Sequence, residues 1–400
     1  MTLKLVNRVL RSAGLELRRS RPGQATRKGV VQTLRPSGQS IGNVLISYVP
    51  DDVMKPDSEV SPSHTHYWEC RHMAKSYAAA GFTVDVIDFA DSSFVPQKNY
   101  DILVAARTNL ERLAKHVGQQ CLKIAHLDTA HFLTHNANAT RRLLDIRDRH
   151  RVSLRSNRMV EDNWAIEAAD LGCVLGNEFT ASSYAFAGKD IHRIPLSSVR
   201  QFDWQADKSF AECRDTFIWF GSGGFAHKGL DLVLDAFAEL PQLKLVVCGP
   251  VDQEPRFVKA FEKRMYQTAN IETIGWIDVT SRAFDDLRRR IVATVYPSCS
   301  EGGGGSVITC MHAGLIPIVT PEASVDVGDT GIVLESATVD AIRDAALALS
   351  RESEQDLQDR ARSAWQRARD NHTREIFAQR YDEFVATVVL PELERRKASC

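Results

Sequence analysis

The sequence has no long apolar run, no paired-cysteine motif and no excess of charge, and each absence excludes a class of protein. No apolar run approaches 18 residues, so a membrane-spanning helix is not expected. The eight cysteines are scattered and form no CxxC pair, which argues against a disulfide framework or a zinc site and favours reduced thiols in a cytosolic enzyme. The formal net charge of −1 argues against nucleic-acid binding, which needs a basic excess. The N-terminus lacks the apolar region and cleavage site of a secretory signal.

Positive charge is concentrated in the first 40 residues, which hold nine Lys and Arg against one acid, Glu16. Apolar residues recur there at helical spacing from Leu3 to Leu17. Two interpretations stay open. The segment is a solvated tail with one short helix, or residues 1–35 lie on an anionic membrane surface as a basic amphipathic helix. The second would place a cytoplasmic protein at the inner face of the membrane.

Short apolar runs alternate with amphipathic stretches along the rest of the chain, and 400 residues predict two domains. The alternation indicates parallel strands covered by helices, an α/β fold. In the first half, strands are expected at 43–49, 82–89, 101–106, 122–128 and 171–177, with helices at 66–81 and 138–168. In the second half, strands are expected at 216–222, 243–249, 270–276, 291–297 and 315–320, with helices at 230–240, 257–267, 284–290 and 306–314 and a helical tail from 340 to 389 that Pro391 ends.

A polar stretch without periodicity, residues 201–214, marks the expected junction between the domains. The predicted division is a basic arm at 1–40, a first Rossmann-like domain at 41–205, a second at 206–372, and a C-terminal helix at 373–400 that is free to pack back on the first domain.

Four consecutive glycines, Gly302, Gly303, Gly304 and Gly305, follow the lone carboxylate Glu301 between an expected strand and an expected helix. Glycine lets a ligand approach the backbone closely, and a helix N-terminus favours a negative group by roughly 0.3–2 kcal/mol. Loops at the carboxyl edge of a parallel sheet also bind ligands in such folds. The run therefore predicts a phosphate site that is neither a P-loop nor a dinucleotide fingerprint. The alternative is a flexible surface loop.

The stretch PSCSEGGGGSVITCMHAGLIPIVT, residues 297–320, resembles the carboxylate-plus-glycine segment of GT-B glycosyltransferases, in particular the retaining enzymes of family 4. FIWFGSGGFAHKGLDLVLDAFAEL, residues 217–240, is similar to that family's Gly-x-x-x-Lys-Gly strand–loop–helix, with Lys228 in the lysine position. GDTGIVL, residues 328–334, resembles the closing segment. The resemblance implies two Rossmann-like doubly wound domains facing a cleft. It is weak in the first half, where such enzymes bind the acceptor.

In this family the lysine and the glycine loop hold the donor's diphosphate, and the carboxylate matching Glu301 contacts the donor sugar. The resemblance therefore implies a glycosyltransferase that moves a sugar from a UDP- or GDP-linked co-substrate to a glycan or glycolipid acceptor, with retention and without a metal or other cofactor. Lys228 and Glu301 are the expected catalytic residues, because a fixed cation stabilises the departing phosphate. The other expected substrate-binding positions on these loops and around the base are Gly221, Ser222, Gly223, Gly224, Gly275, Trp276, Ile277, Ser306 and Thr309.

The sequence departs from the family pattern at two of these positions. Thr309 stands where the family has a glutamate that holds the ribose, and Gly223 stands where it has an arginine that neutralises the diphosphate. A threonine hydroxyl supplies one hydrogen bond, but it cannot supply the charged bidentate contact that a glutamate makes. Ser222 and Gly224 are candidates to replace the arginine. Two other interpretations stay open: a non-catalytic GT-B protein that binds a glycan or a partner, and a nucleotide-sugar epimerase-like enzyme. The sparse acids at the strand ends of the first half argue against the epimerase.

Polar residues of the first half supply three weaker candidates. His131 follows an expected strand and is predicted to act on the transferred sugar or to position the acceptor, unless it is a structural histidine. Asn177 ends another strand on the cleft side and is a candidate for substrate binding. The pairs His131/His135 and His64/His66 have spacings that suit a metal, but no third ligand is in sequence reach, so no metal site is predicted.

Overall fold

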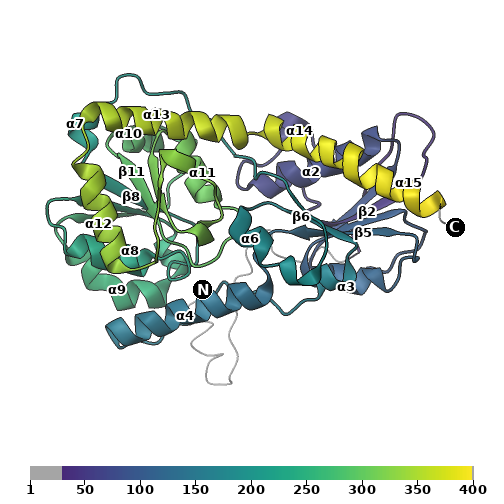
Figure 1. Cartoon of the computed structure of the whole chain (residues 1–400), viewed down its shortest axis with the longest axis horizontal. Coiled ribbons are helices and arrows are strands. Elements are labelled where there is room, and N and C mark those ends of the chain that lie inside the picture. The colour runs from purple at the N-terminus through teal and green to yellow at the C-terminus, as the bar shows by residue number, and fades with distance from the viewer. Residues whose placement is uncertain (1–28, 399–400) are drawn as a thin grey trace, which may run out of the picture.

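Two sheets lie one after the other along the long axis of the molecule in the computed structural model, which describes residues 29–398 (Figure 1). The first sheet has seven strands in the order β1-β3-β2-β4-β5-β6-β7, and the second has six in the order β10-β9-β8-β11-β12-β13. Among the described residues, strands pair in parallel except where β1 runs antiparallel to β3. Helices cover both sheets. The prediction of an α/β fold built from two doubly wound sheets is confirmed.

The elements of the first half alternate as the pattern of apolar runs predicts. Its strands are β1 (Gln32–Leu34), β2 (Asn43–Tyr48), β3 (Thr83–Asp88), β4 (Ile102–Ala105), β5 (Leu122–Leu127), β6 (Leu171–Val174) and β7 (Ile191–Arg193). Its helices are α2 (Thr65–Ala79), α3 (Arg107–Ala114), α4 (Phe132–His150), α5 (Ala165–Ala168) and α6 (Glu178–Ser182).

The second half repeats the alternation and ends in a run of helices. Its strands are β8 (Thr216–Phe220), β9 (Lys244–Cys248), β10 (Ile271–Gly275), β11 (Ala293–Tyr296), β12 (Ile316–Val319) and β13 (Ile332–Val333). Its helices are α7 (Phe210–Cys213), α8 (Leu230–Ala238), α9 (Pro255–Gln267), α10 (Arg282–Arg289), α11 (Gly305–His312), α12 (Val339–Ser350), α13 (Glu354–Asn371), α14 (Arg374–Phe384) and α15 (Leu390–Ala398). The predicted junction, residues 201–214, lies between β7 and β8 along the chain, and its Phe202 and Phe210 pack in hydrophobic clusters of the second half.

The central strands are apolar on both faces because helices cover both faces of each sheet. In β2, Val44 and Ile46 belong to one hydrophobic cluster, and Leu45 between them belongs to the cluster on the opposite face. In β8, Phe217 and Ile218 are divided in the same way. Successive strand residues point to opposite faces, so an unbroken apolar run fills two cores at once.

Helix α4 belongs to the first half by sequence but runs along the second (Figure 1). The expectation of a helix over 138–168 is wrong in its second part. The helix ends at Arg151, which adopts a left-handed conformation with φ 55° and donates its backbone N–H to the carbonyl of Arg147 at 2.8 Å. Residues 152–164 are irregular, and this segment supplies part of the site described below.

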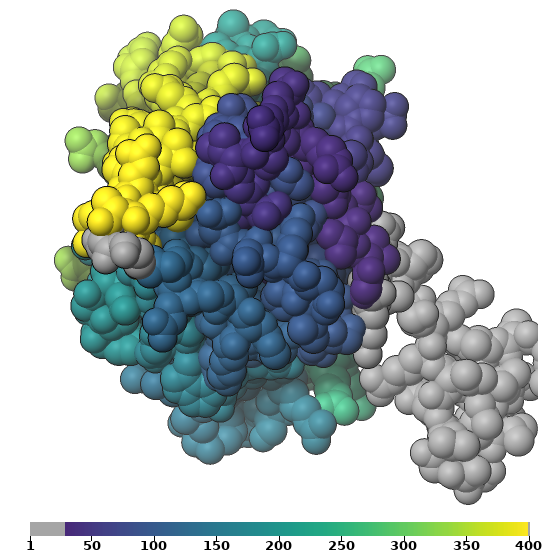
Figure 2. Space-filling view, turned by 90° about the vertical axis from the view of Figure 1, so that its right-hand side faces the viewer, coloured from purple at the N-terminus to yellow at the C-terminus, as the bar shows by residue number. Residues whose placement is uncertain are grey.

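The end of the chain returns to the first half. Helix α14 packs on α2, where the rings of Phe377 and Trp68 lie 6.1 Å apart and those of Tyr381 and Tyr77 lie 6.2 Å apart. Figure 2 shows the C-terminal helices on the surface beside segments from the beginning of the chain. The expectation that Pro391 ends the tail is wrong. A π-helical turn at Val385–Val389 leads without a break into α15, and Pro391 lies inside this continuous helix, just after the π turn ends.

The basic arm predicted at 1–40 falls mostly outside the described residues, because the structure describes none of residues 1–28. Its last part is not a solvated tail. Residues 32–34 form the edge strand β1, and the Thr33 hydroxyl donates to Asp85 Oδ1 at 2.7 Å. Among residues 29–398, no helix is both long enough and apolar enough to cross a membrane.

Candidate active site

Lys228 and Glu301 meet at the point where the second sheet reverses its strand order. The chain builds outward from β8 to β10 and then returns to the other side of β8 with β11. Lys228 follows β8 and Glu301 follows β11, so both lie at the carboxyl edge beside the switch point, where open α/β sheets bind ligands. Lys228 Nζ lies 2.7 Å from Glu301 Oε1, and the two residues are 3% and 7% exposed. The structure thus brings the two predicted catalytic residues into a buried ion pair.

The Glu301 carboxylate is held by several donors. Oε1 accepts hydrogen bonds from Lys228 Nζ, from the Tyr296 hydroxyl at 3.1 Å and from the Ser298 hydroxyl at 3.0 Å, and Oε2 faces Arg158 Nη2 at 3.8 Å. Burial alone raises the pKa of Glu301, but the charge of Lys228 and then that of Arg158 outweigh it, and the pKa falls well below its usual range. Burial lowers the pKa of Lys228 against the pull of Glu301. The carboxylate is therefore ionised at neutral pH.

Tyr296 and Ser298 are site residues that sequence reasoning missed. Lys228 Nζ donates to the Tyr296 hydroxyl at 2.6 Å, and the Ser306 hydroxyl bonds to the same phenol. Burial and then Glu301 raise the pKa of Tyr296 well above its usual value, so the phenol stays neutral. The position of Tyr296 in the sequence could have identified it, because it is the last residue of β11 and lies at the carboxyl edge of the sheet.

Two glycines of the run, Gly302 and Gly304, are needed because other segments of the protein backbone lie against them. A Cβ on Gly302 would lie 2.0 Å from the carbonyl oxygen of Asp128, and one on Gly304 would lie 2.5 Å from the carbonyl oxygen of Ala323. Neither glycine has a positive φ, so close approach of another backbone sets the requirement. Gly303 and Gly305 are half-buried, and Gly305 is the first residue of α11. The amides of Ser306 and of the residue after it lie in the first helical turn, where the helix supplies no acceptor.

The lysine loop, residues 221–229, follows β8 and also depends on glycine. Gly224 has φ +95°, and its N–H donates to Glu254 Oε1 at 2.5 Å. A Cβ on Gly221 would lie 2.8 Å from the ring of Trp219. Ser222 is exposed, and Gly223 is half-buried with only Glu254 Oε1 near its Cβ position, at 3.5 Å.

Gly275 ends the edge strand β10, two strands away from β8 at the same edge of the sheet, and Trp276 and Ile277 follow it. Gly275 has φ +76°, and its carbonyl accepts from Gly249 N–H at 2.9 Å. The Trp276 residue is 69% exposed.

Thr309 lies on α11 and donates its hydroxyl to the carbonyl of Gly305 at 2.8 Å, so only its acceptor capacity is left for a ligand.

His131 and Asn177 have structural contacts. His131 precedes α4, and its ring packs against Phe132 at 4.6 Å and Phe186 at 4.8 Å. Asn177 caps α6 by accepting from Phe179 N–H, and its amide donates to the carbonyl of Pro321 at 3.0 Å, which links the two halves. These contacts hold the fold, and ligand roles for both residues stay predictions.

The first half contributes a polar cluster at its own switch point, between β2 and β4, in which sequence reasoning did not single out Tyr48, Arg107 or His126. Arg107 grips Asp128 with Nε at 3.0 Å and Nη2 at 2.8 Å, and the ring of Tyr48 lies 4.4 Å from that of His126. Within residues 29–398, the Tyr48 hydroxyl and His126 Nε2 are buried without a hydrogen-bond partner. Burial lowers the pKa of His126 to about 4 and that of His64 to about 3, so these imidazoles are neutral at pH 7.

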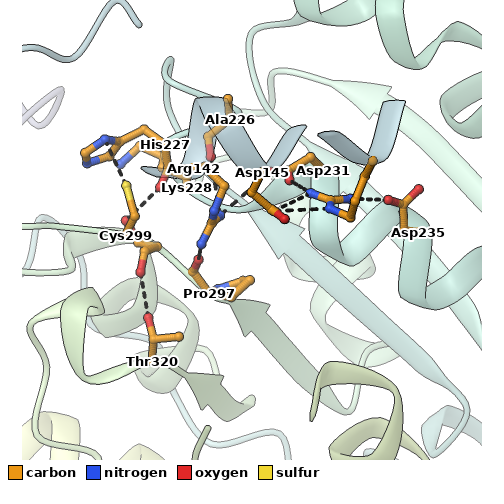
Figure 3. Close-up of polar contacts among 12 residues, drawn as sticks. Arg142, Asp145, Ala226, His227, Lys228, Asp231, Asp235, Pro297, Cys299 and Thr320 are labelled. Carbon is orange, nitrogen blue, oxygen red and sulfur yellow. Dashed lines mark hydrogen bonds and ion pairs between the residues drawn. The ribbon is translucent and has the colours of Figure 1, made fainter. Parts of the chain in front are cut away.

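Helix α4 ties the lysine loop to the glutamate loop, residues 297–304. Arg142 points between the two loops in Figure 3, where Nη2 donates to the carbonyl of Pro297 at 3.1 Å and Nη1 to that of Ala226 at 3.4 Å. Nη1 also lies 3.7 Å from the buried Asp231. Two turns further along α4, Arg149 pairs with Asp231 and with other carboxylates. A helix of the first half thus sets the spacing of the two loops that carry Lys228 and Glu301.

The described part of the chain has no group of three or more His, Cys, Asp or Glu side chains arranged to hold a metal ion. The seven described cysteines are buried free thiols.

Residues 214–352 match the family described as Glycosyl transferases group 1. The second half carries a glycosyltransferase domain. Among solved structures, HepE from Anabaena, in complex with UDP and glucose, is 13% identical with a TM-score of 0.56, over 87% of this chain and 100% of HepE. Sucrose-phosphate synthase from Thermosynechococcus elongatus is 14% identical with a TM-score of 0.59, over 88% of this chain and 100% of the synthase. No curated protein sequence matches the chain.

These likenesses show the GT-B fold, and the family match identifies residues 214–352 as a glycosyltransferase domain. The matched segment contains both Lys228 and Glu301, whereas Arg158 and Arg142 lie before it.

Proposed function

We propose that the chain transfers a sugar from a nucleotide-diphosphate donor to a glycan or glycolipid acceptor, with retention of anomeric configuration and without a metal ion. The observation that carries this proposal is the buried ammonium of Lys228, which lies 2.7 Å from Glu301 and donates to Tyr296, a phenol that Ser306 of the first turn of α11 also contacts. A nucleotide-linked donor is supported by HepE, a protein of the same fold that has been solved in complex with UDP-glucose. Retention rests on the family resemblance of residues 217–240 and 297–320, and metal independence rests on the charge of Lys228 and the amides at Gly303–Ser306, which replace a divalent cation.

In the proposed reaction the bond between the anomeric carbon and the diphosphate oxygen breaks, and its electron pair stays on the diphosphate. The acceptor oxygen forms the new bond to the anomeric carbon, and its proton passes to the departing diphosphate or to solvent. Lys228 faces the growing charge, and the first-turn amides of α11 add fixed dipoles. Glu301 is anionic and accepts hydroxyls of the donor sugar. Its depressed pKa suits this role, because an acceptor must stay ionised.

The acceptor side is proposed to lie against the first half, at Tyr48, His64 and His126. These groups are neutral at pH 7 and offer hydrogen bonds rather than charge, which suits sugar hydroxyls. The proposed location is the cytoplasm, with residues 1–35 holding the protein to an anionic membrane surface.

A non-catalytic binding protein is the second candidate, favoured by the Thr309 hydroxyl that bonds to the helix backbone instead of standing free. Incubation with a panel of UDP- and GDP-sugars, followed by free nucleotide with and without EDTA, separates the candidates. Nucleotide release that EDTA leaves unchanged, with the anomeric configuration of the product read by NMR, tests the proposal. Interconversion of the sugar would indicate an isomerase. No turnover, together with no thermal shift by any nucleotide, would indicate a binding protein.

A further inference from the structure

A second cation stands at the site, and it comes from the irregular segment after α4 rather than from the matched domain. Arg158 Nη2 lies 3.8 Å from Glu301 Oε2, the carboxylate oxygen opposite the one that Lys228 contacts. The Arg158 side chain is 41% exposed, whereas that of Lys228 is 4% exposed. The guanidinium is therefore the cation of this site that a ligand in solvent reaches first.

The backbone around Arg158 is fixed from both halves of the molecule. His135 Nε2 donates to the carbonyl of Arg158 at 2.6 Å from the first turn of α4. The neighbouring Asn157 donates its side-chain amide to Glu254 Oε1 at 2.6 Å, and the same oxygen accepts the N–H of Gly224 in the lysine loop. Burial lowers the pKa of His135, so a neutral imidazole makes the first contact.

The stem of Arg158 lies directly over the lysine loop. A Cβ on Gly224 would come within 2.6 Å of Arg158 Cγ, so glycine at 224 leaves the space that the arginine occupies. One residue earlier, Gly223 has no side chain to offer, and the space around it is open apart from Glu254 Oε1. The position of the guanidinium is thus set by packing against the loop that carries Lys228.

A diphosphate carries more negative charge than one ammonium balances, and Lys228 already donates to Tyr296 and Glu301. A guanidinium presents a planar fork of donors that fits two phosphate oxygens at once, which an ammonium cannot do. We propose that Arg158 binds the leaving diphosphate beside Lys228. The first half then supplies half of the positive charge for bond cleavage, and Glu301 holds both cations in place until the donor arrives. This inference rests on the proposed function.

The test compares R158A with R155A, which removes an exposed arginine of the same segment. R158A is expected to lower kcat for nucleotide release by about 100-fold, the scale of losing an electrostatic stabiliser. It should weaken binding of inorganic pyrophosphate, measured by calorimetry, by about tenfold or more. R155A should stay within about twofold of wild type in both, as expected for an exposed residue that makes no ion pair with Glu301.

Two further variants separate charge from position. R158K keeps the charge but loses the fork and should fall between wild type and R158A. The double variant R158A/G223R places a guanidinium on the lysine loop in the open space beside Gly223 and should recover part of the lost kcat. R158A that matches R155A in both measurements overturns the inference and leaves the proposed function standing. A wild-type chain that neither releases nucleotide nor binds pyrophosphate overturns both.

Discussion

At the scale of single residues, the Lys228–Glu301 pair couples stability to activity. The sequence predicts that Lys228 lies in a cleft. In the structure its ammonium is buried and forms an ion pair with the buried carboxylate of Glu301. K228M leaves Glu301 without its nearest cation, and breaking a buried pair costs about 3–5 kcal/mol. We expect that loss in urea unfolding, together with a fall in nucleotide release of about 100-fold or more.

Removing the second charge provides the control for K228M. K228M/E301Q replaces the uncompensated carboxylate by a neutral amide, so it should regain most of the stability and none of the activity. A double variant no more stable than K228M would contradict the pairing.

The depressed pKa of Glu301 predicts how this stability depends on pH. A carboxyl whose pKa is lower in the folded chain stabilises it fully above its unfolded pKa, near 4.5, and loses that contribution as pH falls through the folded pKa. Wild type should therefore exceed E301Q in unfolding free energy by a constant amount at pH 6–8, and by less at each step below about pH 4.5. Urea titrations at pH 7, 4 and 3 measure the difference, and a gap that widens in acid would refute the assignment.

The sequence was sufficient to predict that Lys228 and Glu301 belong to one site, because each lies in a recognisable loop that follows a strand. It was not sufficient for Arg158 or Tyr48. Arg158 does not follow a strand, and its segment has no hydrophobic periodicity. It reaches the site only because α4 ends at Arg151 and the chain turns back. A charge in an irregular segment gives no periodic signal, so only the folded backbone reveals it.

At the scale of elements, α4 determines the spacing of the lysine and glutamate loops. Arg142 is buried, and R142A removes its bonds to both loops and its charge beside Asp231. We expect a loss of about 3–5 kcal/mol in unfolding free energy, the scale of a broken buried pair, and a lower kcat because the loops separate. R141A removes an exposed neighbour on the same helix and should change neither. Equal behaviour of the two variants would show that α4 does not set the loops.

Helix interiors were predictable from periodicity, whereas two helix ends were not. The polar pattern of α4 continues past residue 151, and only the left-handed Arg151 stops the helix. Pro391 is a residue type that ends helices, yet the helix continues through it after the π-helical turn at Val385–Val389. Both ends depend on backbone angles that side-chain type does not specify.

At the scale of the whole molecule, Gly302 is a point of contact between the halves. Its missing side chain lets the glutamate loop touch the backbone of Asp128, and Thr180 of α6 donates to the carbonyl of Glu301 at 3.1 Å nearby. G302A would force a Cβ to within 2.0 Å of that backbone, so the halves must separate. We expect a larger radius of gyration in X-ray scattering and reduced nucleotide release.

G305A is the matched control for G302A, because its added Cβ would lie 3.6 Å from Leu196 Cδ2, an ordinary contact. The radius of gyration of G305A should equal that of wild type. A G302A chain as compact as G305A would mean that the contact yields without opening the molecule.

The return of α14 to α2 has a consequence for how the chain is made. Phe377 and Tyr381 complete the same hydrophobic cluster as Val44 and Tyr77, about three hundred residues earlier. A ribosome exposes the early strands long before it releases these two aromatic rings, so nascent first-half chains carry an uncovered apolar face until α14 has been made. Helix α14 therefore completes the core of a sheet whose strands were made long before it.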